Sequence, residues 1–387
     1  MPSSFSFLSR VGFILIAFAA YGGGNFYVAQ RLYQWLTLRY TVSLPLFAAI
    51  FTSLALSLFL RFAPVPLAIS RMLQPIAYFW LIAFFYTFTL LLLRDLVLLL
   101  GSRFQAFTLE LLPRISWYSG GLVLLLTVSL ISLGALGANS IAYTHYQVSL
   151  PCLAPESLTI VLISDTHLGG YGNFESRLPG VVRSINAMNP DLVCIVGDIF
   201  NDNFSYVRQP QAVAALFREI QATYGVFASL GNHDGGSSLP QMLEFLAASN
   251  IQVLKDEYQI IAERIALVGR LDARPIGGAL GLERGDMSQA ITTLSAAYTV
   301  LVLEHNPRHL GEYGSEVALL LSGHTHGGQI FPINLVTRAM YQVAYGHWQP
   351  PAGAPQVIVT SGASTWGPPL RLGSRSEIVR IEVNTVP

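Results

Sequence analysis

Long uncharged apolar runs dominate the first part of the chain. Four of them cover residues 11–30, 42–60, 76–93 and 115–138. A helix that crosses the bilayer core of about 30 Å needs roughly 20 apolar residues. Core helices of soluble proteins are shorter and carry a polar face, and a cleavable signal peptide would supply only one such run. The pattern therefore predicts an all-α transmembrane bundle of about four helices within residues 1–150.

The pattern changes after residue 150. Short apolar runs rich in β-branched residues end in polar clusters, and stretches of helical length lie between them. The apolar runs begin at Leu158, Leu192, Val226, Thr299 and Val317, the helical stretches are 174–188, 208–222, 238–249 and 286–297, and two closing strands are 356–360 and 376–383. Apolar runs of this length are typical of strands that are buried on both faces. Their alternation with helices predicts an α/β domain with a largely parallel sheet over residues 151–387.

Composition supports this division of the chain. Hydrophobic residues make up 52% and charged residues 11%, whereas soluble proteins average about 25% charged residues. An ordinary soluble enzyme and a disordered chain are both excluded by these values. Residues 1–150 carry a net charge of +6 and residues 151–387 a net charge of −6. The two cysteines give no disulfide framework, and Cys194, unlike Cys152, lies in an apolar run that predicts a buried thiol.

Arginines between the predicted spans give an orientation. One group of loops carries Arg31, Arg39, Arg94, Arg103 and Arg114, and the opposite group carries Arg10, Arg61 and Arg71. Cytoplasmic loops carry an excess of basic residues. The excess of the first group predicts that those loops are cytoplasmic. Both chain ends, and with them the second half of the protein, are then extracytoplasmic.

Potential metal ligands follow the predicted strands of the second half. They are Asp165, His167, Asp198, Asn232, His233, Asp234, His305, His324 and His326, which include five of the eight histidines of the chain. Side chains at the carboxyl ends of parallel strands gather at one edge of the sheet. Each residue alone is also a common turn residue, but turns do not require imidazole. Imidazoles, carboxylates and an amide together suit divalent Mn, Fe or Zn.

The same residues form a series of short motifs. D-x-H, G-D, G-N-H-D, a single His and G-H-x-H follow one another over residues 158–330, and this order resembles the calcineurin-like metallophosphoesterases. Residues 361–378 also resemble the end of the bacterial membrane-associated branch of that superfamily. The resemblance implies a four-layer αββα sandwich over about residues 155–385 and a site for two divalent metal ions. The four predicted spans lie outside the resemblance, although some members of this branch are attached to a membrane, and they predict a multi-pass protein of the bacterial inner (cell) membrane.

The resemblance also implies a role for each site residue. Asp165, His167 and His326 would bind the first metal, Asn232, His305 and His324 the second, and Asp198 both. Two ions about 3.5–4 Å apart can share a hydroxide, which would be the nucleophile in an in-line displacement at phosphorus. His233 would donate a hydrogen bond to the phosphate or protonate the leaving oxygen, and Asp234 would orient it. A purely structural role of His233 stays open.

Two further features bear on the substrate. Arg371 and Arg375 near the end of the chain can bind a phosphate group through paired hydrogen bonds. Residues 331–345 are apolar with a single charge, Arg338. This stretch either contacts the membrane or a lipid substrate, or packs against its own domain as apolar loops commonly do.

Three classes of function fit these residues. The first is a membrane-bound metal-dependent phosphoester hydrolase, a phosphodiesterase or pyrophosphatase acting on a membrane lipid or a lipid-linked substrate, with no obligate protein partner. The second is a nuclease or nucleotide phosphodiesterase, but the net charge of −6 and the single Lys of the chain argue against nucleic acid. The third is a non-catalytic membrane sensor, which would not need His233 beside a complete ligand set.

Overall fold

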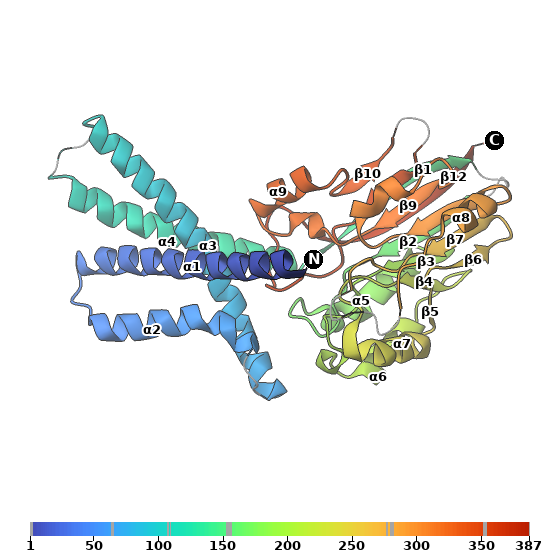
Figure 1. The fold of residues 1–387 in the computed structure, drawn as a ribbon, viewed down its shortest axis with the longest axis horizontal. Coiled ribbons are helices and arrows are strands. Elements are labelled where there is room, and N and C mark those ends of the chain that lie inside the picture. Colours follow the sequence, from blue (N-terminus) through green and yellow to red (C-terminus); the bar gives the residue numbers. More distant parts are fainter. Residues whose placement is uncertain are drawn as a thin grey trace. The chain divides into compact units, whose positions relative to one another are not determined.

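The computed structural model describes residues 3–62, 66–106, 108, 110–151, 157–275, 278, 282–350 and 354–386, so Cys152 lies outside the described residues. The chain divides into two compact units, Met1–Leu133 and Gly134–Pro387 (Figure 1). Each unit has its own architecture.

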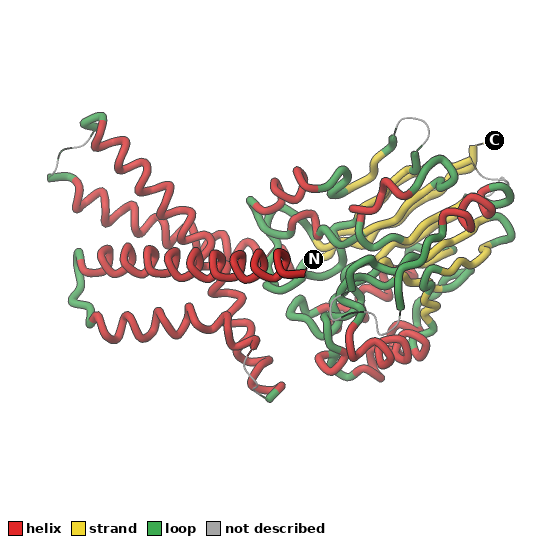
Figure 2. Tube along the Cα trace, in the orientation of Figure 1, coloured by secondary structure: helices red, strands yellow, loops and turns green. Residues whose placement is uncertain are grey.

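The first unit is helical (Figure 2). Its elements are α1 (Ser3–Thr37), α2 (Leu44–Leu56), the 3-10 turn η1 (Ser57–Phe62), α3 (Leu67–Arg103) and most of α4 (Leu112–Ala138). A small core takes one buried residue from each α-helix: Val28, Phe51, Leu91 and Val123. An ion pair between Arg31 Nη2 and Asp95 Oδ2, at 2.7 Å, adds a polar link between α1 and α3.

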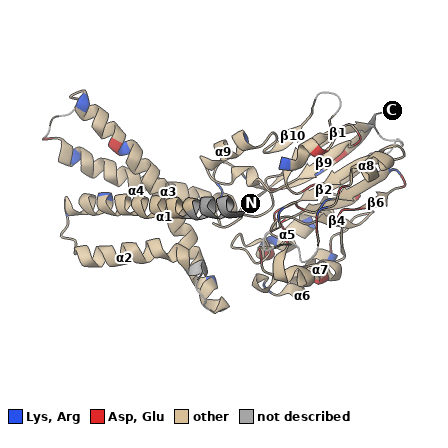
Figure 3. Ribbon diagram, viewed as in Figure 1, with Lys and Arg blue, Asp and Glu red and all other residues tan. Residues whose placement is uncertain are grey.

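Two helices, α3 and α4, are long and apolar enough to cross a membrane. The predicted spans 76–93 and 115–138 lie inside them, and Figure 3 shows how few charged residues these helices carry. The predicted span 42–60 falls on a shorter apolar helix, Leu44–Phe59. The predicted span 11–30 falls within α1. A membrane crossing by α1 and α2 therefore stays a prediction.

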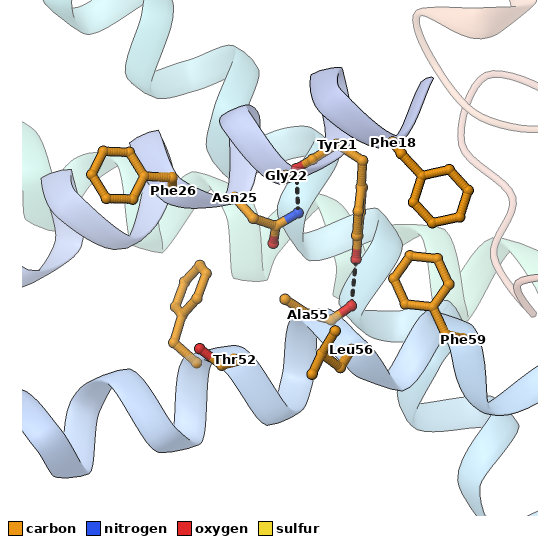
Figure 4. Close-up of a pocket in the computed structure, with 10 residues that line it drawn as sticks. Phe18, Tyr21, Gly22, Asn25, Phe26, Thr52, Ala55, Leu56 and Phe59 are labelled. Carbon is orange, nitrogen blue, oxygen red and sulfur yellow. Dashed lines mark hydrogen bonds between the residues drawn. The ribbon is translucent and has the colours of Figure 1, made fainter. Parts of the chain in front are cut away.

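A cavity of about 310 Å³ lies between α1, α2 and η1 (Figure 4). Its walls are mainly aromatic and aliphatic. The hydroxyl of Tyr21 donates a hydrogen bond to the Ala55 carbonyl oxygen at 2.9 Å. The Asn25 Nδ2 donates to the Tyr21 carbonyl oxygen, also at 2.9 Å. None of the described lining residues is His, Cys, Asp or Glu, so this cavity is not a candidate metal site.

Two six-stranded sheets form the centre of the second unit, with strand orders β1-β12-β2-β3-β4-β5 and β10-β11-β9-β8-β7-β6. The strands are β1 (Ile141–Pro151), β2 (Leu158–Ile163), β3 (Leu192–Val196), β4 (Val226–Ser229), β5 (Ile251–Val253), β6 (Glu257–Ile261), β7 (Ile265–Gly269), β8 (Thr299–Leu303), β9 (Leu319–Ser322), β10 (Gly346–Trp348), β11 (Gln356–Val359) and β12 (Ser376–Val386). Strands β2 to β5 are parallel, and so are β7, β8, β9 and β11. The predicted strands and their largely parallel pairing are confirmed, although in two sheets.

Helices and turns connect these strands. They are α5 (Phe174–Ala187), η2 (Phe204–Tyr206), α6 (Pro210–Arg218), η3 (Gly236–Ser238), α7 (Leu239–Ala248), α8 (Ser288–Ser295), η4 (Pro307–Glu312), η5 (His326–Gly328) and α9 (Ile333–Met340). One apolar core joins α5, α6 and α7 to the first sheet. A second contains residues of both sheets, such as Leu162 and Leu321, and a third joins α8 to the second sheet. Cys194 is buried in the second core, as predicted.

The division between the units differs from the predicted boundary near residue 150. It lies between Leu133 and Gly134, because residues 141–151 form the edge strand β1 of the first sheet. This strand pairs with β12 in parallel along its whole length, from Ile141 opposite Ser376 to Pro151 opposite Val386. The last turn of α4 therefore belongs to the second unit.

Candidate metal centre

The predicted ligands lie directly after strand ends. Asp165 follows β2, Asp198 follows β3, and His305 follows β8. All three are buried. Parallel strands within a sheet direct their carboxyl ends to one edge, and the two sheets share a core. Residues that are 159 positions apart in sequence, such as Asp165 and His324, thereby come within hydrogen-bond distance.

The backbone turns sharply at these positions. Asp165, His167, Asp198, His324 and His326 all have positive φ, between 44° and 70°. Non-glycine residues adopt this left-handed conformation rarely, and it is concentrated at functional sites. Gly197, also at positive φ, has no room for a side chain, because a Cβ there would lie 2.5 Å from His305 Nδ1. The strained turns direct the ligand side chains toward one another.

The first cluster consists of Asp165, His167 and His326, all buried. His167 Nε2 lies 3.2 Å from His326 Nε2. His326 Nε2 in turn lies 3.3 Å from Asp165 Oδ1. Two imidazole nitrogens and a carboxylate oxygen thus converge on one point, which is what a divalent cation requires of its ligands.

The second cluster consists of Asp198, His305 and His324. His305 Nε2 lies 3.2 Å from Asp198 Oδ2 and 3.2 Å from His324 Nδ1. His305 Nδ1 donates a hydrogen bond to the Val196 carbonyl oxygen at 2.9 Å. This bond uses Nδ1 as the donor, so Nε2 is the ring nitrogen that faces the cluster.

Asp198 lies at the junction of the two clusters. Its Oδ2 is 3.2 Å from His305 Nε2 in the second cluster and 3.9 Å from His167 Nε2 in the first. Its Oδ1 accepts a hydrogen bond from the backbone N–H of His233 at 2.8 Å. One carboxylate is therefore within reach of both ligand groups, as a bridging ligand must be.

Buried acceptors without a donor test whether a metal fits. Asn232 Oδ1 and Asp165 Oδ1 are both buried and have no hydrogen-bond partner among the described residues. Such orphaned polar atoms are rare in folded proteins and indicate an ion or a water that they would bind. Both oxygens are good donors to a divalent cation. The residues fit a metal pair, and the place of Asn232 among the second metal's ligands stays a prediction.

Electrostatics of the site support the same conclusion. Burial lowers the pKa of His167 to about 3 and, together with the neighbouring His305, that of His324 to about 4. Both rings are then neutral, which is the form that binds metals. Burial raises the pKa of Asp165 to about 6. A positive charge beside this carboxyl would keep it ionised, and a divalent cation supplies that charge.

His233 lies next to the clusters without belonging to either. Its Nε2 is 4.0 Å from Asp198 Oδ2, and its ring centre is 5.2 Å from that of His167. Its Nδ1 lies 2.6 Å from Asp202 Oδ1. Burial alone would lower the pKa of His233, but the hydrogen bond to Asp202 and the charge of Asp198 raise it above its ordinary value.

The predicted partner of His233 is wrong. The family resemblance implies that Asp234 orients the ring, whereas in the structure Asp202 accepts the hydrogen bond of the ring. The carboxylate of Asp234 is turned to the backbone instead, where it accepts from the N–H groups of Ile199 (3.1 Å), Phe200 (2.8 Å) and Gly231 (2.9 Å). Asp234 therefore stabilises the two loops that carry the ligands. Asp202 was missed because its contact with His233 spans 31 residues.

Asp234→Ala is expected to destabilise the second unit. Three buried N–H groups would lose their acceptor, and each unsatisfied group costs about 1–3 kcal/mol. We expect a loss of about 3–5 kcal/mol, the range for breaking a buried polar network. Thermal unfolding of the purified chain measures it. Asp286→Ala is the control, because Asp286 is exposed and should cost much less; equal melting temperatures of the two variants would contradict the role of Asp234.

Arg371 is not available to bind phosphate, contrary to the prediction. It is only 1% exposed. Its guanidinium donates to backbone carbonyl oxygens, including those of Ser361 at 2.6 Å, Arg375 at 3.0 Å and His326 at 3.1 Å. Arg371 thus holds the turn of His326 in place, while Arg375 is exposed.

The sequence profile of the calcineurin-like phosphoesterases matches residues 158–328, the part of the chain that carries every ligand described above. A metallophosphoesterase of Aquifex aeolicus is 31% identical over 228 residues, which cover 58% of this chain and 85% of that protein. The chain belongs to the calcineurin-like metallophosphoesterase family. The predicted resemblance is thereby confirmed.

The matches to two other relatives are longer than the second unit. A metallophosphoesterase of Campylobacter jejuni is 29% identical over 380 residues, or 95% of this chain and 96% of that protein. A cattle protein named transmembrane protein with metallophosphoesterase domain is 30% identical over 69% of this chain and 62% of its own length. Family membership implies a metal-dependent phosphoester hydrolase. The transmembrane relative and the two apolar helices α3 and α4 indicate association with a membrane.

Proposed function

We propose that this metallophosphoesterase is a membrane-bound, dinuclear-metal-dependent phosphodiesterase or pyrophosphatase that acts on a lipid-linked phosphoester. The position of Asp198 carries the proposal, because its Oδ2 lies 3.2 Å from His305 Nε2 and 3.9 Å from His167 Nε2. Divalent Mn, Fe or Zn bound on both sides of it would supply an activated water and positive charge for the phosphoryl oxygens.

The residues of the chain supply the rest of the chemistry. His233 faces the clusters with Nε2 and is held through Nδ1 by Asp202 at 2.6 Å. A ring fixed in this way can donate a hydrogen bond from Nε2 to a phosphoryl oxygen or a proton to the leaving oxygen. Burial of the ligands limits access of bulk water. A purely structural role of His233 would not explain why its Nε2 faces the two clusters.

The membrane part of the proposal is supported by the helical unit. A chain with α3 and α4 as membrane spans would keep its catalytic unit beside lipid. We further propose four spans, an extracytoplasmic catalytic unit in the bacterial cell membrane, and the four-layer αββα arrangement, which the three apolar cores support. Neither nucleic acid nor an obligate protein partner is part of this proposal.

Metal removal tests the proposed reaction. The purified full-length chain in detergent should hydrolyse a generic aryl phosphodiester, a chelator should abolish turnover, and added Mn²⁺, Fe²⁺ or Zn²⁺ should restore it. A screen of lipid extracts with the same protein, read by mass spectrometry, would then identify lipid substrates by the phosphomonoester products that appear as the parent lipid disappears. Full turnover by metal-free protein would contradict the proposal. Cleavage of DNA with no hydrolysis of any lipid phosphoester would favour the nuclease alternative, and bound metal without any turnover the sensor.

A further inference from the structure

Helix α9 exposes apolar residues and buries a polar one. Ile333, Val336 and Met340 recur at helical spacing on one face, and they are 43%, 57% and 61% exposed. The one buried residue of α9 is Asn334. An amphipathic helix of a soluble domain normally buries its apolar face. We call Ile333, Val336 and Met340, with the exposed Phe331 just before them, the α9 stripe.

The polar side of α9 anchors it to the domain. Asn334 packs so closely against Gly328 that a Cβ on that glycine would lie 2.2 Å from the Asn334 Cα. The N–H of Phe331 donates to the Leu372 carbonyl oxygen at 2.6 Å, and the N–H of Leu372 donates to the Gln329 carbonyl oxygen at 2.9 Å. The helix is therefore fixed to the segment 370–373, and the stripe is left outside as a consequence of this attachment.

The same segment also binds the end of α4. The N–H of Arg371 donates to the Gly134 carbonyl oxygen at 2.8 Å, and a Cβ on Gly137 would lie 2.4 Å from the Arg371 carbonyl oxygen. Both glycines belong to the second unit. They form the last turn of a helix that is long and apolar enough to cross a membrane. Segment 370–373 thus connects α9 to the point where that helix ends.

Basic side chains accompany the stripe. Arg338 on α9 and Arg375 line a cavity of about 480 Å³, together with Tyr345 and with Gly327, the neighbour of the ligand His326. Both arginines are exposed. Among the described residues, neither guanidinium has a hydrogen bond or ion pair. An apolar stripe beside unpaired basic residues is typical of helices that lie in the interface of a membrane with anionic lipids.

We propose that α9 is a membrane-docking helix. The stripe enters the surface of the bilayer by about 5–10 Å, the depth of interfacial helices, and Arg338 and Arg375 bind lipid phosphate groups. The cavity beside His326 then opens to substrates that lie in the bilayer, which makes lipid-anchored phosphoesters the substrate class. In naming this class the inference rests on the proposed function, while the docking of α9 is independent of turnover.

A fluorescent probe on α9 tests the docking. In a Cys152→Ser background, where Cys194 is buried and stays unlabelled, Val336→Cys carries an environment-sensitive dye. The full-length chain is placed in vesicles of phosphatidylcholine and phosphatidylglycerol. We expect a blue-shifted emission and loss of most of the signal with spin-labelled lipids. Tyr258→Cys on β6, 49% exposed, is the control and should respond only to aqueous quenchers.

Two outcomes would overturn the docking. A dye at position 336 that responds like the control, to aqueous quenchers alone, would show that the stripe faces water. A dye protected from both quenchers, with disulfide cross-linking of Val336→Cys between molecules, would show that a second copy covers it.

Activity separates the docking from the proposed reaction. The triple variant Ile333→Ser, Val336→Ser, Met340→Ser should lose hydrolysis of a vesicle-embedded phosphoester several-fold and keep hydrolysis of a soluble aryl phosphodiester. Equal rates of wild type and variant on both substrates would contradict a role of the stripe in lipid access. Wild type that hydrolyses neither substrate would refute the proposed function, and the fluorescence result would still decide whether α9 docks.

Discussion

Asp198→Asn is expected to lose both metal ions and nearly all phosphodiesterase activity. The carboxylate lies within 4 Å of ligand atoms in both clusters, at 3.2 Å from His305 and 3.9 Å from His167. An amide has only one oxygen and no charge, so it cannot bind two cations in the same way. Removal of a residue that only hydrogen-bonds to a metal ligand already lowers metal affinity or activity about 10–100-fold. We therefore expect a loss of more than about 100-fold, measured by hydrolysis of an aryl phosphodiester with elemental analysis of the same sample.

The matched control is Asp191→Asn. Asp191 accepts a hydrogen bond from the Thr159 N–H at 2.8 Å outside the site, and its variant should keep both metals and activity. Unchanged metal content in Asp198→Asn would contradict a bridging role. Loss of both metals in Asp191→Asn as well would show that the assay reports folding and not ligation.

His233→Ala should lose activity but retain both metals, unlike Asp198→Asn, which should lose both. The ring lies beside the clusters but not in them, with Nε2 at 4.0 Å from Asp198 Oδ2. Removal of a general acid or a hydrogen-bond donor to the reacting group typically costs about 10²–10⁴-fold. Turnover of an aryl phosphodiester at saturating Mn²⁺, compared with the metal content, measures both properties. Metal loss in this variant would mean that His233 is a structural or ligating residue.

Asp202→Asn is the companion variant for His233. An amide at this position could still contact Nδ1 but would no longer attract its proton, so the ring would lose its fixed orientation. We expect an intermediate loss of activity with both metals bound. The double variant Asp202→Asn, His233→Ala should be no less active than His233→Ala alone, because Asp202 acts through that ring. An additive loss would contradict the pairing.

Much of the catalytic unit could be predicted because its signals are local. Strands such as β3 and β8 are continuous apolar runs, and their ends carry Asp198 and His305. Since parallel strands direct their ends to one edge, a list of strand-end residues already indicates a cluster. The apolar runs alone do not predict the grouping into two sheets, because runs buried on both faces do not show which neighbour they pair with. Only the family resemblance, with its αββα sandwich, implies two sheets.

Contacts between distant residues account for the errors. Asp202 has positive φ in a turn, as Asp residues of turns often do, and nothing in its neighbourhood indicates a bond to His233. Asp234 is adjacent to His233 in sequence, but its carboxylate turns to backbone N–H groups of another loop. Proximity in sequence was a poor guide to side-chain direction.

The start of the second unit was also misplaced for a physical reason. Residues 141–151 follow the apolar run of α4 directly, so the change of pattern after residue 150 places them with the helical unit. Their alternation of polar and apolar side chains is the pattern of a strand with one buried face, as the buried Val148 and Leu150 of β1 show. For α9 the sequence leaves packing and membrane contact open, and the burial of Asn334 in place of the stripe is the observation on which the proposed docking rests.

The bridged metal pair is tested most directly by electron paramagnetic resonance of the full-length protein loaded with Mn²⁺. Two ions about 3.5–4 Å apart that share a ligand are magnetically coupled, so we predict the spectrum of an exchange-coupled pair in wild type and its absence in Asp198→Asn. A wild-type spectrum of isolated Mn²⁺ ions alone, at saturating metal, would contradict the account.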